Sequence, residues 1–206
     1  MAARLVGQHG KTTQVLSIRF RNDDWERLYE EGRKRYRNAI KGGYHTPTIS
    51  GVQDQEDNDA RAFIAENAVA FVLRLAELND PTTGGALIGE NPDSGWDLIT
   101  LDGFTFDVKY TGHKGGHLLF QNIAKFRADA AVLCWPGYGK HDIDIVGGIK
   151  RNRWYQEVFT KQLTPERIGW LVKSEKLSPM SQVLSLLRKR RQLHEMTLSP
   201  QLEYAE

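Results

Sequence analysis

Residues 96–110 have the sequence Trp-Asp-Leu-Ile-Thr-Leu-Asp-Gly-Phe-Thr-Phe-Asp-Val-Lys-Tyr, which predicts a β-hairpin. An Asp-Gly dipeptide between two alternating runs, here Asp102-Gly103, is the strongest short-range signal for such a turn. In the second strand, the period of two places Asp107 and Lys109 side by side on one face. The opposite face is apolar and consists of Phe104, Phe106, Val108 and Tyr110.

The length of the hairpin loop decides where Asp97 points. A two-residue loop pairs Asp97 with Val108 and turns its side chain away from Asp107. A three-residue loop over residues 101–103, with Gly103 in a left-handed conformation, places Asp97 opposite Asp107. We expect the three-residue loop. Two carboxylates about 5 Å apart repel each other unless a cation lies between them, which is what a divalent metal site provides.

An unusually apolar helix is predicted before the hairpin, from residue 59 to residue 78, with Asp59 as its N-cap. Glu66 points out of the apolar face of this helix, where a carboxylate costs several kcal/mol unless it is paired, hydrogen-bonded, protonated or bound to a metal. Two interpretations follow: Glu66 is a metal ligand, or it is a buried glutamate satisfied by an arginine or by backbone amides. Its helical neighbours are Ala62, Phe63, Val69, Ala70 and Leu73.

These features together resemble the PD-(D/E)XK nuclease superfamily: a helix with a glutamate, an aspartate that opens one strand, and Asp-X-Lys on the next strand. The resemblance covers about residues 61–159, including the apolar run 130–135 and the late segment 145–150. The superfamily's literal Pro-Asp occurs here as Pro92-Asp93, so Asp93 is a rival to Asp97 as a ligand. Asp97 is preferred because it begins the predicted strand.

The resemblance implies a divalent-metal-dependent nuclease that hydrolyses DNA phosphodiester bonds and leaves a 5′-phosphate. Asp97 and Asp107, with the carbonyl of Val108, would hold Mg²⁺ or Mn²⁺, and Glu66 would bind the same ion through water or bind a second ion. Lys109 would orient and help deprotonate the attacking water, or stabilise charge on the phosphorane. The expected partner is branched or duplex DNA, as for a resolvase-like or restriction-like endonuclease, with a homodimer supplying two sites.

Further residues are candidate nucleic-acid contacts. Lys114 lies in the glycine-rich segment 111–116, which is also typical of an ordinary hairpin loop, and Gln121 follows on the next predicted strand, where it is also a common sheet residue. A basic run near the C-terminus could contact phosphates or could be a solvated helix end. That run is Arg188, Lys189, Arg190 and Arg191.

The composition predicts one domain with appendages. A chain of 206 residues with 40% hydrophobic content buries one substantial core. We expect an α/β (α+β) fold in which a central mixed β-sheet, with a restriction-endonuclease-like core, is flanked by helices. Residues 1–50 are predicted to be an N-terminal strand–helix extension, residues 59–172 the core, and residues 173–206 a C-terminal basic helix and tail.

The net charge of +2 hides an asymmetry along the chain. Residues 1–50 contain ten lysines and arginines against five acids, residues 51–110 contain three against twelve, and residues 111–172 contain nine against five. Basic flanks around an acidic middle are compatible with a solvated acidic face or with a cation site between surfaces that attract a polyanion.

The remaining elements follow from periodicity and turn signals. Strands are predicted at residues 15–20, 118–123, 130–135 and 143–149. A helix with Asn22 or Asp23 as N-cap is predicted to end at residues 41–43, and two more helices are predicted at residues 152–162 and 179–194. Residues 44–58 are predicted to be a linker or surface loop.

Several classes of protein are disfavoured. No apolar run is long enough to cross a bilayer and the N-terminus lacks the pattern of a secretion signal, so we expect a cytoplasmic protein. The single Cys134 rules out an internal disulfide and a multi-cysteine zinc site. Two alternatives to the nuclease stay open: a non-catalytic nucleic-acid-binding protein on a nuclease-like fold, and a structural protein in which Glu66 and Asp107 pair with Lys109 and Arg74.

Overall fold

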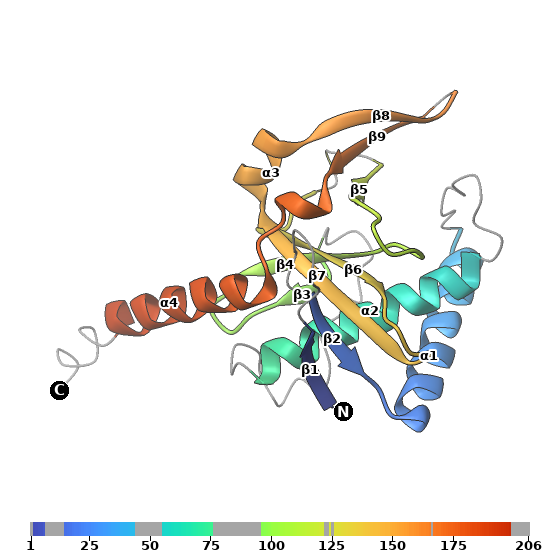
Figure 1. The fold of residues 1–206 in the computed structure, drawn as a ribbon, viewed down its shortest axis with the longest axis horizontal. Helices are drawn as coiled ribbons and strands as arrows, with labels where there is room; N and C mark the ends of the chain where they lie inside the picture. The colour runs from blue at the N-terminus through green and yellow to red at the C-terminus, as the bar shows by residue number, and fades with distance from the viewer. Residues whose placement is uncertain are drawn as a thin grey trace.

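Six strands form a central sheet in the order β1–β2–β7–β6–β4–β3 (Figure 1). β4 and β6 are parallel, and the other neighbours are antiparallel, so the sheet is mixed as expected. This computed structural model describes residues 2–6, 15–43, 55–75, 96–121, 124, 126–165 and 167–198. The strands of this sheet are β1 (Ala2–Val6), β2 (Val15–Arg19), β3 (Leu98–Ile99), β4 (Thr105–Tyr110), β6 (Ala130–Pro136) and β7 (Asp142–Lys150).

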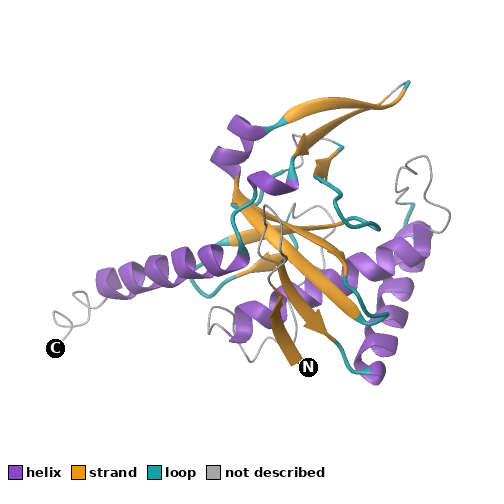
Figure 2. Cartoon of the chain, in the orientation of Figure 1, coloured by secondary structure: helices purple, strands orange, loops and turns teal. Residues whose placement is uncertain are grey.

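A second, three-stranded sheet has the order β5–β9–β8 and is antiparallel. Figure 2 shows its strands as a group separate from the central sheet. The helices complete an α+β fold, which confirms the predicted fold class. The remaining elements are β5 (Leu118–Phe120), β8 (Phe159–Thr164), β9 (Arg167–Val172), α1 (Asn22–Lys41), α2 (Gln55–Leu75), α3 (Arg151–Glu157), the short 3-10 helix η3 (Ser174–Lys176) and α4 (Met180–Leu198).

The hairpin formed by β3 and β4 lies at one edge of the central sheet. Leu98 pairs with Phe106, and the amide of Thr100 donates to the carbonyl of Phe104 at 2.9 Å. Gly103 has φ +78°, a left-handed conformation that side chains with a Cβ rarely adopt. The predicted three-residue loop is therefore confirmed, and it places Asp97 beside Asp107.

Apolar side chains pack on both faces of the central sheet. Along β6, Val132 and Cys134 join one buried cluster, and Leu133 joins the other, as the period of two requires. The first cluster includes Phe106 and Val108 of β4 and side chains from α1, α2 and α4. Asp107 and Lys109 therefore point to the opposite face, which the second cluster occupies.

Helices α1 and α2 pack closely against each other on the first face. Gly32 of α1 makes this possible, because a Cβ at that position would lie 2.7 Å from the Cα of Ala60 and 3.1 Å from the Cβ of Phe63. The absence of a side chain on Gly32 thus sets how near α1 comes to the helix that carries Glu66.

The N-terminal segment, predicted to be a strand–helix extension at residues 1–50, contributes β1 and β2 to the central sheet. β2 lies between β1 and β7, and its Ile18 pairs with Ile143. The helix that follows starts one residue after Arg21, which is extended and occupies the N-cap position instead of Asn22 or Asp23. Arg21 is held there by a hydrogen bond from its Nε to Asp24 at 3.0 Å.

Two predicted helices have different bounds. α2 begins at Gln55, four residues before the predicted cap, and Asp59 lies inside the helix, where Gln55 donates to its carboxylate at 3.0 Å. The predicted helix at residues 152–162 ends at Glu157, because Val158 is extended and the chain then pairs with β9. Strand pairing outweighs the local helical pattern there. The predicted end of α2 near residue 79, the rival ligand Asp93 and most of the predicted linker lie outside the described residues.

Gly32→Ala tests the packing of α1 on α2. We expect the added methyl group to force the helices apart and to lower the free energy of unfolding by about 1–3 kcal/mol. Urea denaturation measures this difference. Gly42→Ala is the matched control, because a Cβ there lies 3.4 Å from its nearest contact and the residue has φ −75°. Equal stabilities of the two variants would contradict the role of Gly32.

Arg19→Ala tests how β2 is anchored to β7. Both nitrogens of the Arg19 fork donate to the buried carboxylate of Asp142, at 2.9 Å each, and this hydrogen bonding is the largest cause of the lowered pKa of Asp142. A lowered pKa means that the pair stabilises the fold above the ordinary aspartate value of about 3.9 and that this contribution is lost as the pH falls through the folded value.

We therefore expect a lower urea midpoint for Arg19→Ala than for the wild type at pH 7, and equal midpoints at the acid end of a pH series. Arg21→Ala is the control, since Arg21 pairs with Asp24 within its own helix turn. A difference that persists unchanged at acid pH would show that the charge pair is not responsible.

Candidate active site

Asp97 lies directly before β3 and bonds to β4 through both its backbone and its side chain. Its amide donates to the carbonyl of Phe106 at 2.7 Å, and its Oδ2 accepts the amide of Val108 at 2.6 Å. The N–H and C=O of one residue point to the same edge of a strand. The carbonyl of Val108 therefore faces the same edge of β4 as the Asp97 carboxylate.

Asp107 and Lys109 form an ion pair on the other face of β4. The ammonium of Lys109 contacts Oδ1 of Asp107, a buried atom that has no well-aligned hydrogen bond. Lys109 also lies over the ring of Phe120, 5.3 Å from its centre. The side chain of Lys109 is 37% exposed and that of Asp107 is 6% exposed, so Lys109 is the more exposed partner of the pair.

Glu66 is largely buried and is paired with an arginine from α1. Nη1 of Arg35 donates to Oε2 of Glu66 at 3.3 Å, while the guanidinium lies 4.8 Å from the centre of the Phe63 ring. In this structure Glu66 is therefore a buried glutamate that has an arginine partner, as the second interpretation of the sequence predicts. The partner is not Arg74, whose Nε is buried without a hydrogen-bond partner among the described residues.

The four residues predicted to carry chemistry interact electrostatically. Burial raises the pKa of Asp97 well above its ordinary value, and the nearby Glu66 and Asp107 raise it further. Burial also raises the pKa of Glu66, against the opposing effects of Arg35 and Lys109. Burial lowers the pKa of Lys109, but the three carboxylates together outweigh it and raise that pKa.

The edge of β4 is where these groups meet. Glu66 comes from the helix on one face of the sheet, and Asp107 and Lys109 come from the other. Among the described residues, β3 pairs with β4 through Leu98 and Ile99, and next to them the Asp97 carboxylate accepts the amide of Val108. A helix side chain can therefore interact with the far face of β4 around this edge.

The side chains as placed do not form a metal centre. Across the described part of the chain, no three His, Cys, Asp or Glu side chains are arranged to hold a metal ion. The chemistry of the donors nevertheless fits a hard cation: Asp97 and Asp107 are adjacent oxygen donors, and Asp107 Oδ1 is buried with only an ion pair.

The predicted nucleic-acid contacts lie outside this group. Lys114 pairs with Asp144 at 3.0 Å and lies over the ring of Tyr138, 3.4 Å from its centre. Gln121 is exposed just after β5. The basic run lies on α4, where Arg190 pairs with Asp102 at 2.6 Å and Arg188, Lys189 and Arg191 are its neighbours.

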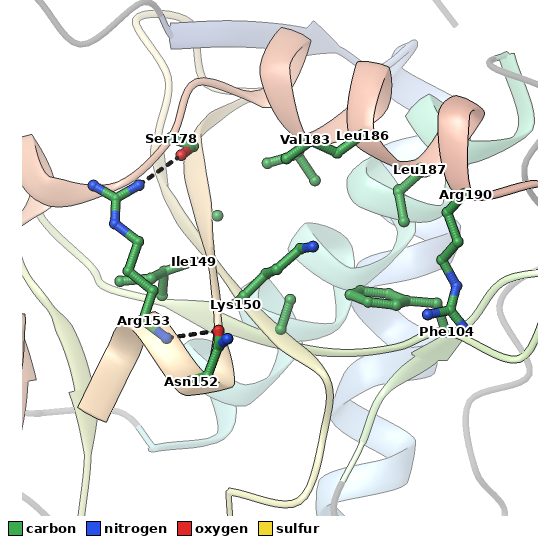
Figure 3. Close-up of a pocket in the computed structure, with 12 residues that line it drawn as sticks. Phe104, Ile149, Lys150, Asn152, Arg153, Ser178, Val183, Leu186, Leu187 and Arg190 are labelled. Carbon is green, nitrogen blue, oxygen red and sulfur yellow. Dashed lines mark hydrogen bonds between the residues drawn. The ribbon is translucent and has the colours of Figure 1, made fainter. Parts of the chain in front are cut away.

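A groove of about 300 Å³ lies between α4 and the end of β7. Figure 3 shows Phe104, Leu187 and Arg190 on one side of it and Asn152 and Arg153 on the other. Phe104 belongs to the face of β4 opposite Asp107 and Lys109. The groove is therefore separate from the acidic group, and none of the four predicted catalytic side chains lines it.

Arg35 is the residue of this site that sequence reasoning did not single out. The signal for it was indirect: a buried glutamate needs a cationic partner, and α1 carries arginines at positions 33, 35 and 37, of which 33 and 37 share one side of the helix and 35 lies on another. Helical periodicity separates Arg35 from Arg33 and Arg37, but it does not say which side of α1 lies near Glu66. Only the packing of α1 on α2 selects it.

Comparison with known proteins found no match: no protein-family model fits this chain, and no curated protein or solved structure is detectably similar to it. Within the described residues, no helix has both the length and the apolar character needed to span a membrane.

Asp97→Asn tests the crowding of carboxylates at the β4 edge. Asparagine keeps an acceptor for the Val108 amide but removes one of three interacting negative charges. We expect the free energy of unfolding at neutral pH in EDTA to rise by about 1–2 kcal/mol. Thermal and urea denaturation measure the change.

Asp102→Asn is the control on the same hairpin. Asp102 accepts hydrogen bonds from Arg190 and from Thr100, so removal of its charge should destabilise the protein. If both asparagine variants lose stability, repulsion among the carboxylates is not what Asp97 contributes.

Proposed function

We propose that this protein is a divalent-metal-dependent endonuclease that hydrolyses DNA phosphodiester bonds. The observation that supports the proposal best is the register of the β3–β4 hairpin, which brings Asp97 beside Asp107 with Lys109 two residues further along β4. Glu66 interacts electrostatically with the same group from α2. A carboxylate pair, a third acid from a helix and a lysine are the set that the PD-(D/E)XK superfamily uses.

Asp97 and Asp107, with the carbonyl of Val108, would hold Mg²⁺ or Mn²⁺, and Glu66 would contribute through water or to a second ion. Magnesium suits such a sparse oxygen site because it keeps several waters and takes phosphate oxygens from the substrate. The ion would supply Lewis-acid stabilisation of charge on the phosphate.

The protein's own groups have separate tasks in this proposal. The amide of Val108 holds the Asp97 carboxylate in place, as its 2.6 Å hydrogen bond indicates. Lys109 is an ammonium with three donors and no acceptor, so it would orient the attacking water and stabilise negative charge on the phosphorane. Its contact with the Phe120 ring and its ion pair with Asp107 hold the ammonium beside the Asp107 carboxylate.

The wider proposal is a cytoplasmic enzyme of the resolvase-like or restriction-like kind. Cutting both strands of a duplex takes two such sites, which a homodimer would supply. The products would carry a 5′-phosphate and a 3′-hydroxyl.

One observation favours a second candidate, a non-catalytic nucleic-acid-binding protein on a nuclease-like fold. Two of the three acids are already neutralised by internal partners, Asp107 by Lys109 and Glu66 by Arg35. Permanent ion pairs of this kind would leave a stable scaffold without a reaction centre.

Lys109→Ala and Asp107→Asn test the nuclease. Purified wild-type protein is incubated with supercoiled plasmid and with a four-way DNA junction, in Mg²⁺, Mn²⁺ or EDTA, and products are resolved on gels. We expect cleavage only with a divalent ion, and a loss of about 100-fold or more in either variant, because Lys109→Ala removes a cation that stabilises the transition state and Asp107→Asn removes a charged ligand of the ion.

Lys140→Ala is the matched control, since Lys140 is exposed in the turn between β6 and β7. DNA affinity measured in Ca²⁺ separates binding from chemistry. Cleavage that ignores EDTA and survives both substitutions would refute the mechanism, and tight binding without cleavage would favour the second candidate.

A further inference from the structure

Arg35 covers Glu66 on its solvent side. The arginine side chain is 44% exposed and the glutamate side chain is 14% exposed, although the two are joined by a 3.3 Å contact. The guanidinium lies over the ring of Phe63, one turn before Glu66 on α2. Arg35 therefore has a second contact, with the Phe63 ring, that does not depend on Glu66.

The neighbouring arginines on α1 form ion pairs with a different carboxylate. Arg33 and Arg37 both bond to Glu56, at 2.6 and 2.7 Å. The carboxylate partner of Arg35 is Glu66, one of the acids of the candidate site. Of these three arginines, Arg35 is the one whose contact would be disturbed by a cation entering the site.

The formal charges of the site favour an exchange of partners. Glu66, Asp97 and Asp107 bring three negative charges, and Lys109 and Arg35 bring two positive ones. A divalent cation would leave the group with an excess positive charge, which repels the guanidinium from Glu66 and attracts one phosphodiester. Arginine suits this second contact because its planar fork matches a phosphate.

We propose that Arg35 is a phosphate clamp that is released by metal binding. It neutralises Glu66 in the metal-free protein and turns to a phosphate of the bound nucleic-acid strand once Glu66 is engaged by a divalent ion. This inference rests on the proposed function and deepens it, because it makes metal binding and substrate binding mutually dependent. Such coupling is reciprocal: the strand that takes up Arg35 also strengthens the binding of the ion.

The test is the effect of Ca²⁺, an ion that supports binding in the absence of cleavage, on the DNA affinity of wild type and Arg35→Ala. Fluorescence anisotropy with a labelled duplex and a labelled four-way junction is measured in EDTA and in Ca²⁺ at one ionic strength. In EDTA the two proteins should bind DNA equally within about twofold, because Arg35 is held by Glu66. In Ca²⁺ the variant should bind about 5- to 10-fold more weakly.

Two further variants sharpen the result. Arg35→Lys keeps the charge without the fork, so it should recover part of the lost affinity. Arg27→Ala removes an exposed arginine of the same helix, whose contacts with Asp24 and Glu31 are long at 3.9 and 3.8 Å, and it should behave as wild type. Circular dichroism melting of each variant verifies folding.

Binding of Mn²⁺ by calorimetry supplies a second measurement. Because Arg35 and the ion compete for Glu66, Arg35→Ala should bind Mn²⁺ several-fold more tightly than wild type in the absence of DNA. A merely structural role for Arg35 would weaken Mn²⁺ binding instead, and that result would overturn the inference.

The inference is also overturned if Arg35→Ala loses the same DNA affinity with and without Ca²⁺, or loses none in either condition. If either of these affinity results is obtained while wild type cleaves DNA and Lys109→Ala does not, the role of Arg35 is refuted and the proposed nuclease activity still stands. If wild type neither binds nor cleaves DNA, the proposed function fails together with the clamp.

Discussion

Mutual repulsion of carboxylates at the edge of β4 that faces β3 is the constraint on which the rest of the site depends. Burial and the nearby Glu66 and Asp107 raise the pKa of Asp97, and burial and the nearby Asp107 raise the pKa of Glu66. Three compensating contacts make the arrangement tolerable: the amide of Val108 on Asp97, the ammonium of Lys109 on Asp107, and the guanidinium of Arg35 on Glu66. Each contact comes from a different element or a different face of the sheet.

The surrounding fold brings these elements together. The left-handed Gly103 sets the hairpin register that places Asp97 next to Asp107, and the bare backbone of Gly32 lets α1 approach α2. Groups that repel one another in the absence of a ligand are a feature of functional sites, where stability is sacrificed for a charge distribution that a cation or a substrate completes. This is why the candidate site lies at the strand edge and not in the apolar groove beside α4, where the interacting carboxylates are absent from the lining.

The N-terminal strand and helix belong to the same body as the site. β2 contributes pairing to β7, and its Arg19 is fixed to the buried Asp142. α1 continues directly from this strand and carries Arg35 to Glu66. The charge balance of the acidic group therefore depends on a segment that looks, by its position in the chain, like an appendage.

Turn chemistry and periodicity in the sequence were sufficient to predict the hairpin, because Asp102-Gly103 and the alternation of residues 104–110 act over a few positions. The same alternation determines that Asp107 and Lys109 share one face. The same local rules placed β6, β7 and the main helices. Tertiary structure alone decided that Arg35 pairs with Glu66, that Lys114 pairs with Asp144, that β2 enters the central sheet, and that residues 159–164 form a strand rather than a helix. The physical reason for the first three is range: an ion pair or a strand pairing between segments 30 or more positions apart depends on how whole elements pack, and no local pattern encodes that packing. The strand at residues 159–164 instead pairs with the nearby β9, whose other neighbour is the distant β5.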